Sequence, residues 1–410
     1  MKSSYKQTAI GLIPIDWEVK KLGDIALIKG DYGINAAAVD FDEKLPAYIR
    51  ITDIDDDGYF TAKKKKSVDD INSNNFFLEV NDLVFVRTGA TVGKSYLYNE
   101  RDGKLVFAGF LIRFRIDTTK TNPYYIWTFT KTKPYWDWVN MVSMRSGQPG
   151  INSNEYSTLQ LPIPPLPEQK RIAQILSTWD TAIDNCKTII EKLQLRNKGL
   201  AQQLLSGKMK VKGFERKWKI TPLSECLTYT PREVPKPTRN YLALGLRSHG
   251  KGIFHKHDID PEDVAMDILY EVKENDFIVN ITFAWEQAFA IVSKKDEGGL
   301  VSHRFPTYTF KTQTAIPQFF RHFIIQKYFK FLMELISPGG AGRNRVMSKT
   351  DLLKLEVKIP DVKEQKTIAN ILDTAAAELN QYQQKLQQLQ LQKKGLMQQL
   401  LTGKVRVKIN

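Results

Sequence analysis

Cysteine is nearly absent from this chain, and long apolar runs are absent altogether. The two cysteines, Cys186 and Cys226, are too few and too far apart for a disulfide framework or a zinc cluster. No stretch approaches the ~20 uncharged apolar residues of a membrane helix, and residues 1–17 lack the apolar core of a signal peptide. We therefore expect a protein of the reducing cytoplasm, without a membrane span.

Negative charge is also in short supply. Lysine and arginine number 60 against 45 aspartates and glutamates, which gives a formal net charge of +15. Because each phosphate contact releases counterions, such a surplus favours a polyanionic partner. With 42% hydrophobic and 11% aromatic residues, the 410-residue chain is otherwise typical of a folded protein of two or three domains.

Enzyme signatures occur only in incomplete form. Residues 89–95 (GATVGKS) are one residue short of a nucleotide-binding P-loop, and the following SYLYNE predicts a strand, not a helix whose N-terminus would face a phosphate. Residues 53–58 resemble the start of a calcium-binding loop, but Lys64 takes the place of its bidentate glutamate. Neither segment predicts a ligand site.

Three further patterns are equally incomplete. Residues 122–125 (NPYY) lack the second proline of the amino-methyltransferase signature, and residues 360–366 (PDVKEQK) hold the acidic residues of a nuclease signature too close together. His255 and His257 have no third metal ligand nearby. We predict no catalytic residue, no metal site and no cofactor.

The strongest feature of the sequence is an internal duplication, a signal that decides architecture. Shifted by 196 positions, residues 164–212 align with residues 360–408 without a gap, and 23 of the 49 pairs are identical. The identities cluster at the two ends of the repeat, around the Glu-Gln-Lys of its beginning and the Gly-Leu-x-Gln-Gln-Leu-Leu of its end. A match of this length indicates two copies of one structural element.

Each copy has apolar residues at alternating steps of four and three, the pattern of a coiled-coil helix. About 38 residues at 1.5 Å each predict a rod roughly 57 Å long. One seam cannot bury itself, so we expect the two rods to pair, and antiparallel pairing would give a pseudo-two-fold axis. The residues expected to pair the helices are Leu176, Ile183, Ile190, Leu193, Leu372, Leu379, Leu386 and Leu389.

Polar residues and glycines interrupt this seam at equivalent positions. Asn197 and Lys393 form a polar layer, which often sets the register of a coiled coil. Gly199 and Gly395 lie inside the helices, where a glycine costs ~1 kcal/mol against alanine. A kink or a close backbone approach would explain the glycine pair, and we favour close approach.

Two stretches rich in short β-like runs, residues 1–166 and 209–362, alternate with the predicted helices at 167–208 and 363–410. Each has an aromatic helical segment, at 123–142 and at 317–336, and an Asn-Asp pair before an apolar strand. Elsewhere they diverge. The fold class is thus α+β, with two globular α/β domains separated by two long antiparallel helices.

This organisation resembles the specificity subunit of type I restriction-modification enzymes. The resemblance covers essentially the whole chain and is carried by LPIPPLPEQ (161–169), KRIAQIL (170–176), GLAQQLLSGK and GLMQQLLTGK. The start of the second predicted helix, IPDVKEQKTIANIL, lacks the LPPL motif usual in this family but keeps Glu364 and Gln365.

The resemblance implies a non-catalytic subunit that reads double-stranded DNA in two parts. Each globular domain would be a target-recognition domain for one half-site. The paired helices would set the spacer between the half-sites and dock two methyltransferase subunits, and motor-nuclease subunits would add restriction.

Loops rich in glycine, arginine and amides are the candidates for DNA contact, because bases need donors and acceptors while phosphates need positive charge. In the first domain the predicted contacts are Arg87, Thr88, Gly89, Thr91, Lys94, Ser95, Arg145, Ser146 and Gln148. In the second they are Thr282, Trp285, Gln287, Arg304, Arg343, Asn344 and Arg345. The lysine run at 63–66 fits a solvated face better than a phosphate track.

Two other function classes fit parts of the sequence. The chain would be an adaptor if its coiled coil scaffolded proteins and its β-rich domains bound peptides, and DNA binding that is absent or independent of salt would favour this reading. It would be a self-sufficient enzyme if the purified chain alone methylated or cut DNA, and we expect neither activity.

Overall fold

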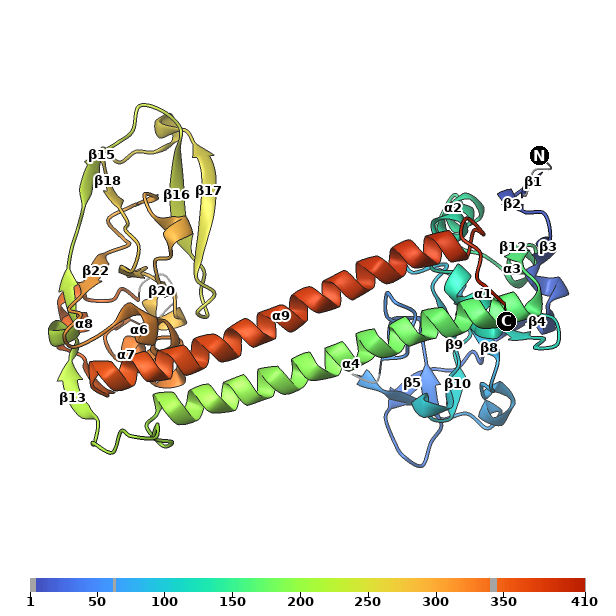
Figure 1. Ribbon diagram of the computed structural model, residues 1–410, viewed down its shortest axis with the longest axis horizontal. Coiled ribbons are helices and arrows are strands. Elements are labelled where there is room, and N and C mark those ends of the chain that lie inside the picture. Colours follow the sequence, from blue (N-terminus) through green and yellow to red (C-terminus); the bar gives the residue numbers. More distant parts are fainter. Residues whose placement is uncertain (1–4, 62–63, 340–344, 410) are drawn as a thin grey trace. The chain divides into compact units, whose positions relative to one another are not determined.

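A computed structural model describes residues 5–61, 64–339 and 345–409, and its contacts divide the chain into two compact units. Unit 1 comprises residues 1–187 and 385–410, and unit 2 comprises residues 188–384. Each unit therefore contains one globular part together with a portion of each long helix (Figure 1).

The central sheet of unit 1 is antiparallel, with the strand order β4-β11-β8-β9. Every residue of β8 is buried, which accounts for its continuous apolar sequence. Strands β8 and β11 are two of the short β-like runs expected within residues 1–166. The bounds of the four strands are β4 (Ala26–Tyr32), β8 (Asp82–Val86), β9 (Ser95–Leu97) and β11 (Leu111–Ile116).

The other strands of unit 1 form a second four-stranded sheet, in which β10 and β6 are parallel, and two small strand pairs, β1 with β2 and β3 with β12. Their bounds are β1 (Tyr5–Thr8), β2 (Gly11–Pro14), β3 (Glu18–Lys21), β5 (Ala38–Asp40), β6 (Ala47–Ile49), β7 (Lys66–Val68), β10 (Leu105–Phe107) and β12 (Gln160–Ile163). The short 3-10 helices are Leu22–Asp24, Ile51–Asp53, Ser73–Phe76 and Glu100–Asp102.

The aromatic segment of unit 1 folds into two helices, α1 (Pro123–Phe129) and α2 (Lys133–Val142), with α3 (Ser153–Ser157) following. The Asn122 side chain accepts a hydrogen bond from the Tyr125 amide and caps α1, while Pro123 takes the first helical position. The Asn-Pro pair that resembled a methyltransferase signature thus begins a helix.

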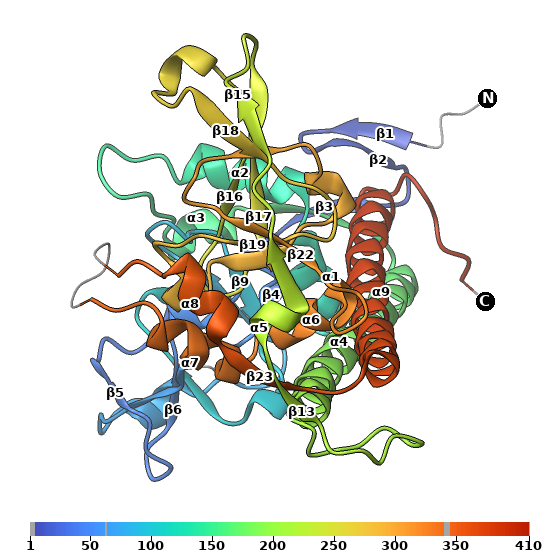
Figure 2. The ribbon, with the colours of Figure 1, turned by 90° about the vertical axis from the view of Figure 1, so that its left-hand side faces the viewer.

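Unit 2 repeats the same plan. Its central sheet has the order β14-β22-β19-β20, so each strand has a counterpart in unit 1, and a five-stranded sheet β15-β18-β21-β16-β17 lies beyond it (Figure 2). The central strands are β14 (Leu227–Tyr229), β19 (Phe277–Val279), β20 (Phe289–Ile291) and β22 (Thr307–Phe310). The outer strands are β15 (Glu233–Pro235), β16 (Tyr241–Leu246), β17 (Ile253–Ile259), β18 (Ile268–Glu271) and β21 (Leu300–Val301).

The remaining elements of unit 2 also follow unit 1. Helices α6 and α7 correspond to α1 and α2, and the strand pair β13–β23 corresponds to β3–β12. Their bounds are β13 (Lys219–Pro222), α5 (Leu223–Cys226), α6 (Pro317–Phe323), α7 (Lys327–Leu335), α8 (Lys349–Lys354) and β23 (Glu356–Ile359). Three 3-10 helices span Pro261–Asp263, Ala284–Glu286 and Lys294–Asp296.

The Asn-Asp pair shared by the two domains is a turn that starts the buried strand. Asn81 and Asn275 are left-handed, with φ of 74° and 71°, a conformation that asparagine tolerates. The buried carboxylate of Asp82 accepts from the backbone amide of Glu79 at 2.8 Å. In unit 2, Asp276 accepts from the amide of the residue three positions earlier at 2.9 Å.

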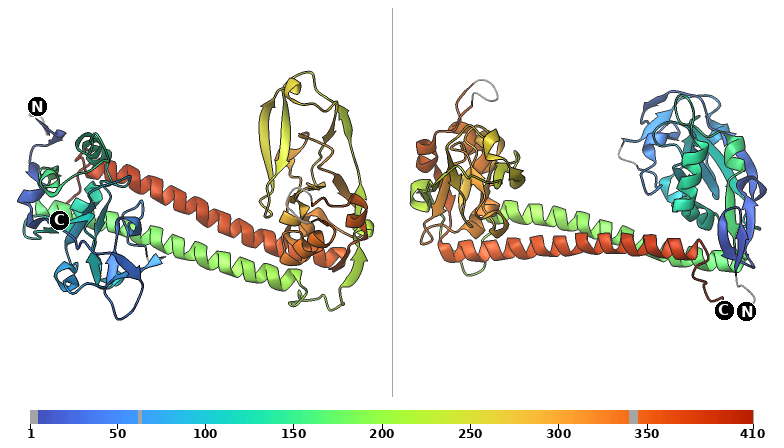
Figure 3. Two further views of the ribbon diagram at one scale, coloured as in Figure 1. Left: turned by 180° about the vertical axis from the view of Figure 1, so that it is seen from behind. Right: turned by 90° about the horizontal axis from the view of Figure 1, so that it is seen from above.

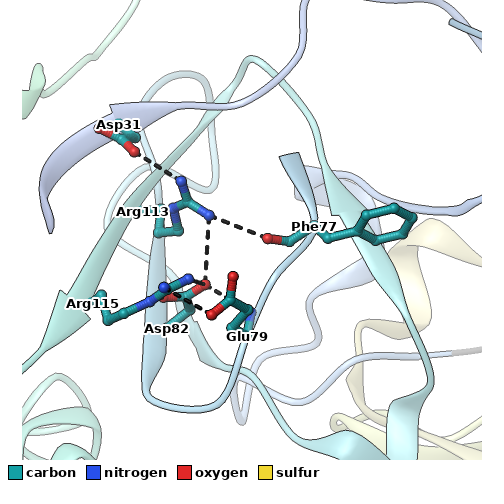
Figure 4. A network of polar contacts seen from close by, with 6 residues as sticks. All are labelled: Asp31, Phe77, Glu79, Asp82, Arg113 and Arg115. Carbon is teal, nitrogen blue, oxygen red and sulfur yellow. Dashed lines mark hydrogen bonds and ion pairs between the residues drawn. The ribbon is translucent and has the colours of Figure 1, made fainter. Parts of the chain in front are cut away.

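An arginine neutralises each of these buried aspartates. Figure 4 shows that Arg115 donates to the Asp82 carboxylate from Nε and Nη2, at 2.7 and 3.0 Å. Arg113 donates to the Asp31 carboxylate and to the Phe77 carbonyl. In unit 2 the bidentate partner of Asp276 is an arginine from a different segment, Arg232. The two units therefore share the same Asn-Asp turn, but the arginine that pairs with its aspartate comes from a different segment in each unit.

The duplicated segments form two continuous helices, α4 (Leu166–Leu205) and α9 (Val362–Leu400), which lie side by side within each unit (Figure 3). In unit 1, Lys393 pairs with Asp180. In unit 2, Asn197 Nδ2 donates to the Ala375 carbonyl at 2.8 Å and Arg196 pairs with Glu378 at 2.7 Å. Residues near the start of each helix contact residues near the end of the other, so the two helices pair in antiparallel orientation, as expected.

The polar residues of the seam do not form a shared layer. Antiparallel pairing places Asn197 and Lys393 in different units, where each contacts a residue of the facing helix. The expectation of close backbone approach at the glycines is wrong: no atom outside the local helix backbone lies within 4 Å of a Cβ placed on Gly199 or Gly395.

The eight residues expected to pair the helices differ in burial. Leu176 and Leu372 also belong to the hydrophobic cores of unit 1 and unit 2. Ile183, Ile190 and Leu193 are buried. The three remaining residues, Leu379, Leu386 and Leu389, are half-buried.

A tryptophan joins the two helices in each unit. In unit 1, buried Trp17 donates from Nε1 to Glu168 at the start of α4, at 3.1 Å, and contacts Gly403 just past the end of α9. In unit 2, Trp218 donates to Glu364 at the start of α9, at 3.2 Å, and contacts Gly207 just past the end of α4. We call these two arrangements the tryptophan clamps.

The residues beside each clamp explain why the ends of the repeat are identical. Gly207 and Gly403 have φ of 68° and 71°, and a Cβ on either would lie 3.3 Å from the tryptophan ring. Gln169 accepts from the Asn122 amide and donates to the Pro164 carbonyl, both at 2.8 Å. The Gln365 side chain likewise accepts from the Ile316 amide and donates to the Pro360 carbonyl. The Glu-Gln pair therefore anchors the start of each long helix to the globular part of its unit.

Replacing Trp17 by phenylalanine should destabilise the chain by about 1–3 kcal/mol, because the buried Glu168 carboxylate loses a hydrogen-bond donor. The measurement is the free energy of urea unfolding. Trp138→Phe is the matched control, since the Trp138 ring packs on the same core. Equal losses in the two variants would show that the hydrogen bond contributes nothing.

Candidate nucleic-acid interface

In unit 1 the predicted glycine-rich loop is the connection between β8 and β9. Gly89 and Gly93 have φ of 85° and 90°, and the Gly93 amide bonds the Val86 carbonyl at 3.0 Å. The chain leaves the loop as strand β9, as predicted from sequence. The loop that resembled a P-loop therefore presents backbone and short side chains at a strand end.

The second predicted loop of unit 1, residues 143–150, lies against the first. The Gly89 amide donates to the Pro149 carbonyl at 3.1 Å, and the Ile151 amide donates to the Arg87 carbonyl at 2.8 Å. Thr88 also forms an isolated β-bridge with Gly150. The structure thus brings the two loops together as one surface, on which Ser146 and Gln148 are exposed and Thr91 is half-buried.

The cations of this surface already have partners. Arg87 stacks over the Tyr32 ring at 4.7 Å. Lys94 forms an ion pair with Asp56 at 2.6 Å, and Arg145 forms one with Glu155 at 2.5 Å. Because Asp56 is almost fully exposed, a phosphate could replace it at little cost in desolvation.

Burial removes Ser95 from the predicted contact set. Its side chain is 0% exposed, and its Oγ lies 2.6 Å from Thr130 Oγ1 and 3.2 Å from Lys131 Nζ. Ser95 instead holds Lys131, whose ammonium also donates to the Ser95 carbonyl at 3.1 Å and lies 4.9 Å from the Trp127 ring. Desolvation lowers the pKa of Lys131 to about 7.

In unit 2 the equivalent loop connects β19 and β20. Thr282 is 6% exposed, so its side chain is also too buried for direct contact, but its carbonyl accepts from Trp285 Nε1 at 3.2 Å. Gln287 is half-buried and left-handed, with a φ of 62°, and its amide donates to the Ile325 carbonyl. Gln287 is the C-cap of the 3-10 helix Ala284–Glu286, a position where a left-handed residue ends a helix.

A second loop again lies against the first. The Met347 amide donates to the Ile281 carbonyl at 2.8 Å, and Arg345 stacks over the Trp285 ring at 4.8 Å. Arg304 is exposed and its carbonyl accepts from the Ile281 amide at 3.0 Å. The predicted contacts Arg343 and Asn344 lie outside the described residues.

Sequence reasoning missed one loop of this surface, between β16 and β17. The His249 amide donates to the Glu286 carbonyl at 2.6 Å, and Ser248 Oγ donates to the Glu286 carboxylate at 2.8 Å. His249 has a φ of 63°, and the glycines at 250 and 252 are left-handed as well. The sequence RSHGKG between two apolar runs was the available signal, because it is basic and rich in glycine.

Two negative findings concern the described residues alone. Their histidines, cysteines and carboxylates include no group of three or more placed to hold a metal ion. Over the same residues, no helix combines the length and apolarity needed to cross a bilayer.

Comparison with known proteins gives one consistent family. The sequence model of the type I restriction modification DNA specificity domain matches residues 14–195 and 248–391. The type I restriction enzyme MjaVIII specificity subunit of Methanocaldococcus jannaschii is 25% identical over 419 residues, which cover 97% of this chain and 94% of that protein. The crystal structure of a type I restriction-modification S subunit from M. genitalium superposes with a TM-score of 0.56 at 13% identity, over 98% of this chain and 99% of that one.

The pKa of Lys131 predicts a pH dependence of stability. Between about 7 and the ordinary lysine value of 10.5, the unfolded chain binds this proton and the folded chain does not, so Lys131 makes the unfolding free energy rise with pH. Lys131→Met should therefore show a shallower rise over this range in urea melts. Identical slopes for the two proteins would contradict the lowered pKa.

Proposed function

The chain belongs to the type I restriction-modification DNA specificity family, and from this premise we propose that it reads a two-part DNA sequence, one part with each unit. The supporting observation is that both units pair two loops at the same edge of the same four-stranded sheet. Because the two sheets have the same strand order, the loops occupy equivalent positions in the two units. Because the side chains on the loops differ between the units, we propose that each unit reads different bases.

The side chains on the two surfaces differ in kind. Unit 1 offers an arginine stacked on tyrosine, an exposed glutamine and the glycine loop, where the backbone can approach DNA closely. Unit 2 offers Arg345 stacked on Trp285, with Gln287 and Arg304 nearby. Arginine and glutamine make bidentate contacts with guanine and adenine, respectively. We keep the predicted contacts other than Ser95 and Thr282 as the proposed interface.

We further propose that catalysis belongs to partner subunits. Two methyltransferase subunits dock on the chain, and motor-nuclease subunits join for restriction, in the cytoplasm where the DNA is. In this assignment residues 1–166 and 209–362 are the target-recognition domains, and residues 167–208 and 363–410 are the spacer helices. The antiparallel contacts of α4 and α9 support the spacer role, because they fix the register of the two helices.

The ion pairs on the unit 1 surface give a test of DNA contact. Asp56→Asn frees Lys94 and removes a negative charge, so it should tighten binding of random-sequence duplex roughly three- to tenfold at low salt. Titrations at two salt concentrations measure this gain, which should shrink as salt rises. The control Glu18→Gln frees Lys20 outside the loops with the same change in net charge. An equal gain in both variants would mean that only net charge matters.

The spacer role predicts the result of a paired deletion. Removing residues 184–190 and 383–389 takes one heptad from each helix and keeps the antiparallel register. Each helix shortens by about 10.5 Å, or about three base pairs of B-DNA. Mapping methylated positions in a host genome should show a shorter spacer between two unchanged half-sites. An unchanged spacer would contradict the proposal, and a genome with no bipartite motif would contradict the proposed function itself.

A further inference from the structure

The β8–β9 loop of unit 1 and the β19–β20 loop of unit 2 have the same length and the same hydrogen-bond frame. The first loop is closed by a bond from the Val86 amide to the Lys94 carbonyl, at 2.8 Å. The second is closed by a bond from the Asn280 amide to the Ala288 carbonyl, also at 2.8 Å. Each closing pair encloses seven residues, so each position of one loop has a defined counterpart in the other.

This correspondence pairs a buried valine with a carboxylate. Val92, the sixth residue of the unit 1 loop, is 9% exposed and packs in the hydrophobic core of its unit. Glu286, the sixth residue of the unit 2 loop, is half-buried. Because the shared frame accepts an apolar side chain at this position, the frame itself does not require the carboxylate.

The neighbouring β16–β17 loop does not require the carboxylate either. The His249 and Gly250 amides donate to the carbonyls of Glu286 and Gln287, at 2.6 and 3.1 Å, and these main-chain bonds are compatible with any side chain at position 286. The Glu286 side chain accepts one bond, from Ser248 Oγ to Oε2 at 2.8 Å. Among the described residues, Oε1 has no hydrogen-bond partner. Ser248 therefore orients a carboxylate that keeps one oxygen free.

Glu286 is also the one acidic residue in the sequence of the segments that form the unit 2 surface. These segments contain five arginines and lysines, and they are residues 247–252, 281–287, 302–306 and 337–347. A carboxylate in such basic company is expected to form an ion pair. Within the part of the chain that the structure describes, no lysine, arginine or histidine forms one with Glu286.

Glu286 thus differs from the carboxylates on the unit 1 surface. Asp56 and Glu155 each pair with a cation of that surface, so they reduce its attraction for phosphates. The Glu286 carboxylate has no such cation to neutralise, and the phosphates of a bound duplex repel it. A hydrogen bond donated by the DNA can offset this repulsion, because an ionised carboxylate only accepts.

The donors that DNA presents in its major groove are the amino groups of cytosine and adenine. The cytosine N4 amino group matches a carboxylate, whereas adenine also places its N7 acceptor beside the N6 amino group, where it would face the carboxylate oxygens. Guanine offers two acceptors, N7 and O6, and thymine offers the acceptor O4. A carboxylate therefore selects cytosine by attraction and rejects the other bases by repulsion between acceptors.

We propose that Glu286 is a specificity-determining residue of unit 2, which accepts a hydrogen bond from the N4 amino group of one cytosine, and that Ser248 positions its carboxylate. This inference rests on the proposed function, and it adds the identity of one base in the half-site that unit 2 reads. Gln287 and Arg345 flank this contact and can read adenine and guanine at neighbouring positions.

Glu286→Gln tests the assigned base. The full chain is expressed with the methyltransferase subunits of its own system in a host without such a system, and the methylated positions of the host genome are mapped. One cytosine in one half-site should relax to cytosine or adenine, because glutamine both donates and accepts. All other positions of both half-sites should stay the same. The control Glu225→Gln removes the same charge from an exposed site of α5, outside the loops, and should leave the motif unchanged.

Titrations of the full chain with synthetic duplexes give the magnitude. Replacing that C·G pair by T·A should weaken wild-type binding roughly tenfold or more, and binding of Glu286→Gln by less than about threefold. The variant should also bind random-sequence duplex about two- to fivefold tighter at low salt, because a negative charge leaves the surface. The Glu225→Gln control should gain less. Higher general affinity with lower discrimination has no explanation in misfolding.

Ser248→Ala tests the positioning role. This variant removes the bond that orients the carboxylate and keeps the charge. Cytosine should remain the preferred base, the preference for cytosine over thymine should fall roughly threefold, and the affinity for random-sequence duplex should stay the same. Unchanged discrimination would overturn the role of Ser248.

The remaining outcomes separate the assigned base from the proposed function. An unchanged motif in Glu286→Gln, or a change at a position that is not cytosine, would overturn the assignment and leave the proposed function standing. Methylation lost while random-duplex binding is retained would support it, because recognition alone has failed. Loss of both would overturn it, since removing a base-reading carboxylate does not weaken phosphate contacts. A wild-type assembly whose methylated sites form no two-part motif would overturn the proposed function, and the assignment with it.

Discussion

The tryptophan clamp is the interaction on which the rest of the structure depends. A single indole donates to the carboxylate at the start of one long helix and covers the glycine that ends the other. It therefore ties the two helices to each other and to the globular part at once. Unit 1 strengthens the clamp with Arg406, which binds both Glu168 and Asp16, and these hydrogen bonds raise the pKa of Arg406 further above its usual value.

The clamp frees the globular parts to diverge. The helix starts are held by the Glu-Gln pair and the tryptophan, and the start of the buried strand is held by the Asn-Asp turn. Unit 1 has left-handed Gly89 and Gly93 in the loop between β8 and β9, whereas unit 2 has left-handed Gln287 in the equivalent loop. A non-glycine residue at positive φ costs of order 1–3 kcal/mol, which the large buried core of unit 2 can offset.

The sequence predicted the helices, their antiparallel pairing and the main strands, because these follow from local periodicity and from a duplication visible without structure. It named both loops of each domain as candidates for DNA contact, but it did not show that they lie against each other, because that depends on hydrogen bonds between segments far apart in the sequence. It could not show that Ser95 and Thr282 are buried, since burial of a small polar residue depends on a distant partner such as Lys131. The close backbone approach expected at Gly199 and Gly395 was wrong for a related reason. A sequence shows that a glycine has no side chain, but it does not show whether another segment of the chain packs against that position.

The ion pairs at the unit 1 surface bear on how specificity arises from a chain of net charge +15. If Lys94 and Arg145 were unpaired, they would bind any duplex through its phosphates, and nonspecific sites would compete with the target. Their carboxylate partners Asp56 and Glu155 must be displaced first, which weakens that sequence-independent attraction. The base contacts that we propose for Arg87 and Gln148 keep their full value, because neither side chain is paired with those carboxylates. The proposed interface thus gains discrimination because part of its own positive charge is already paired.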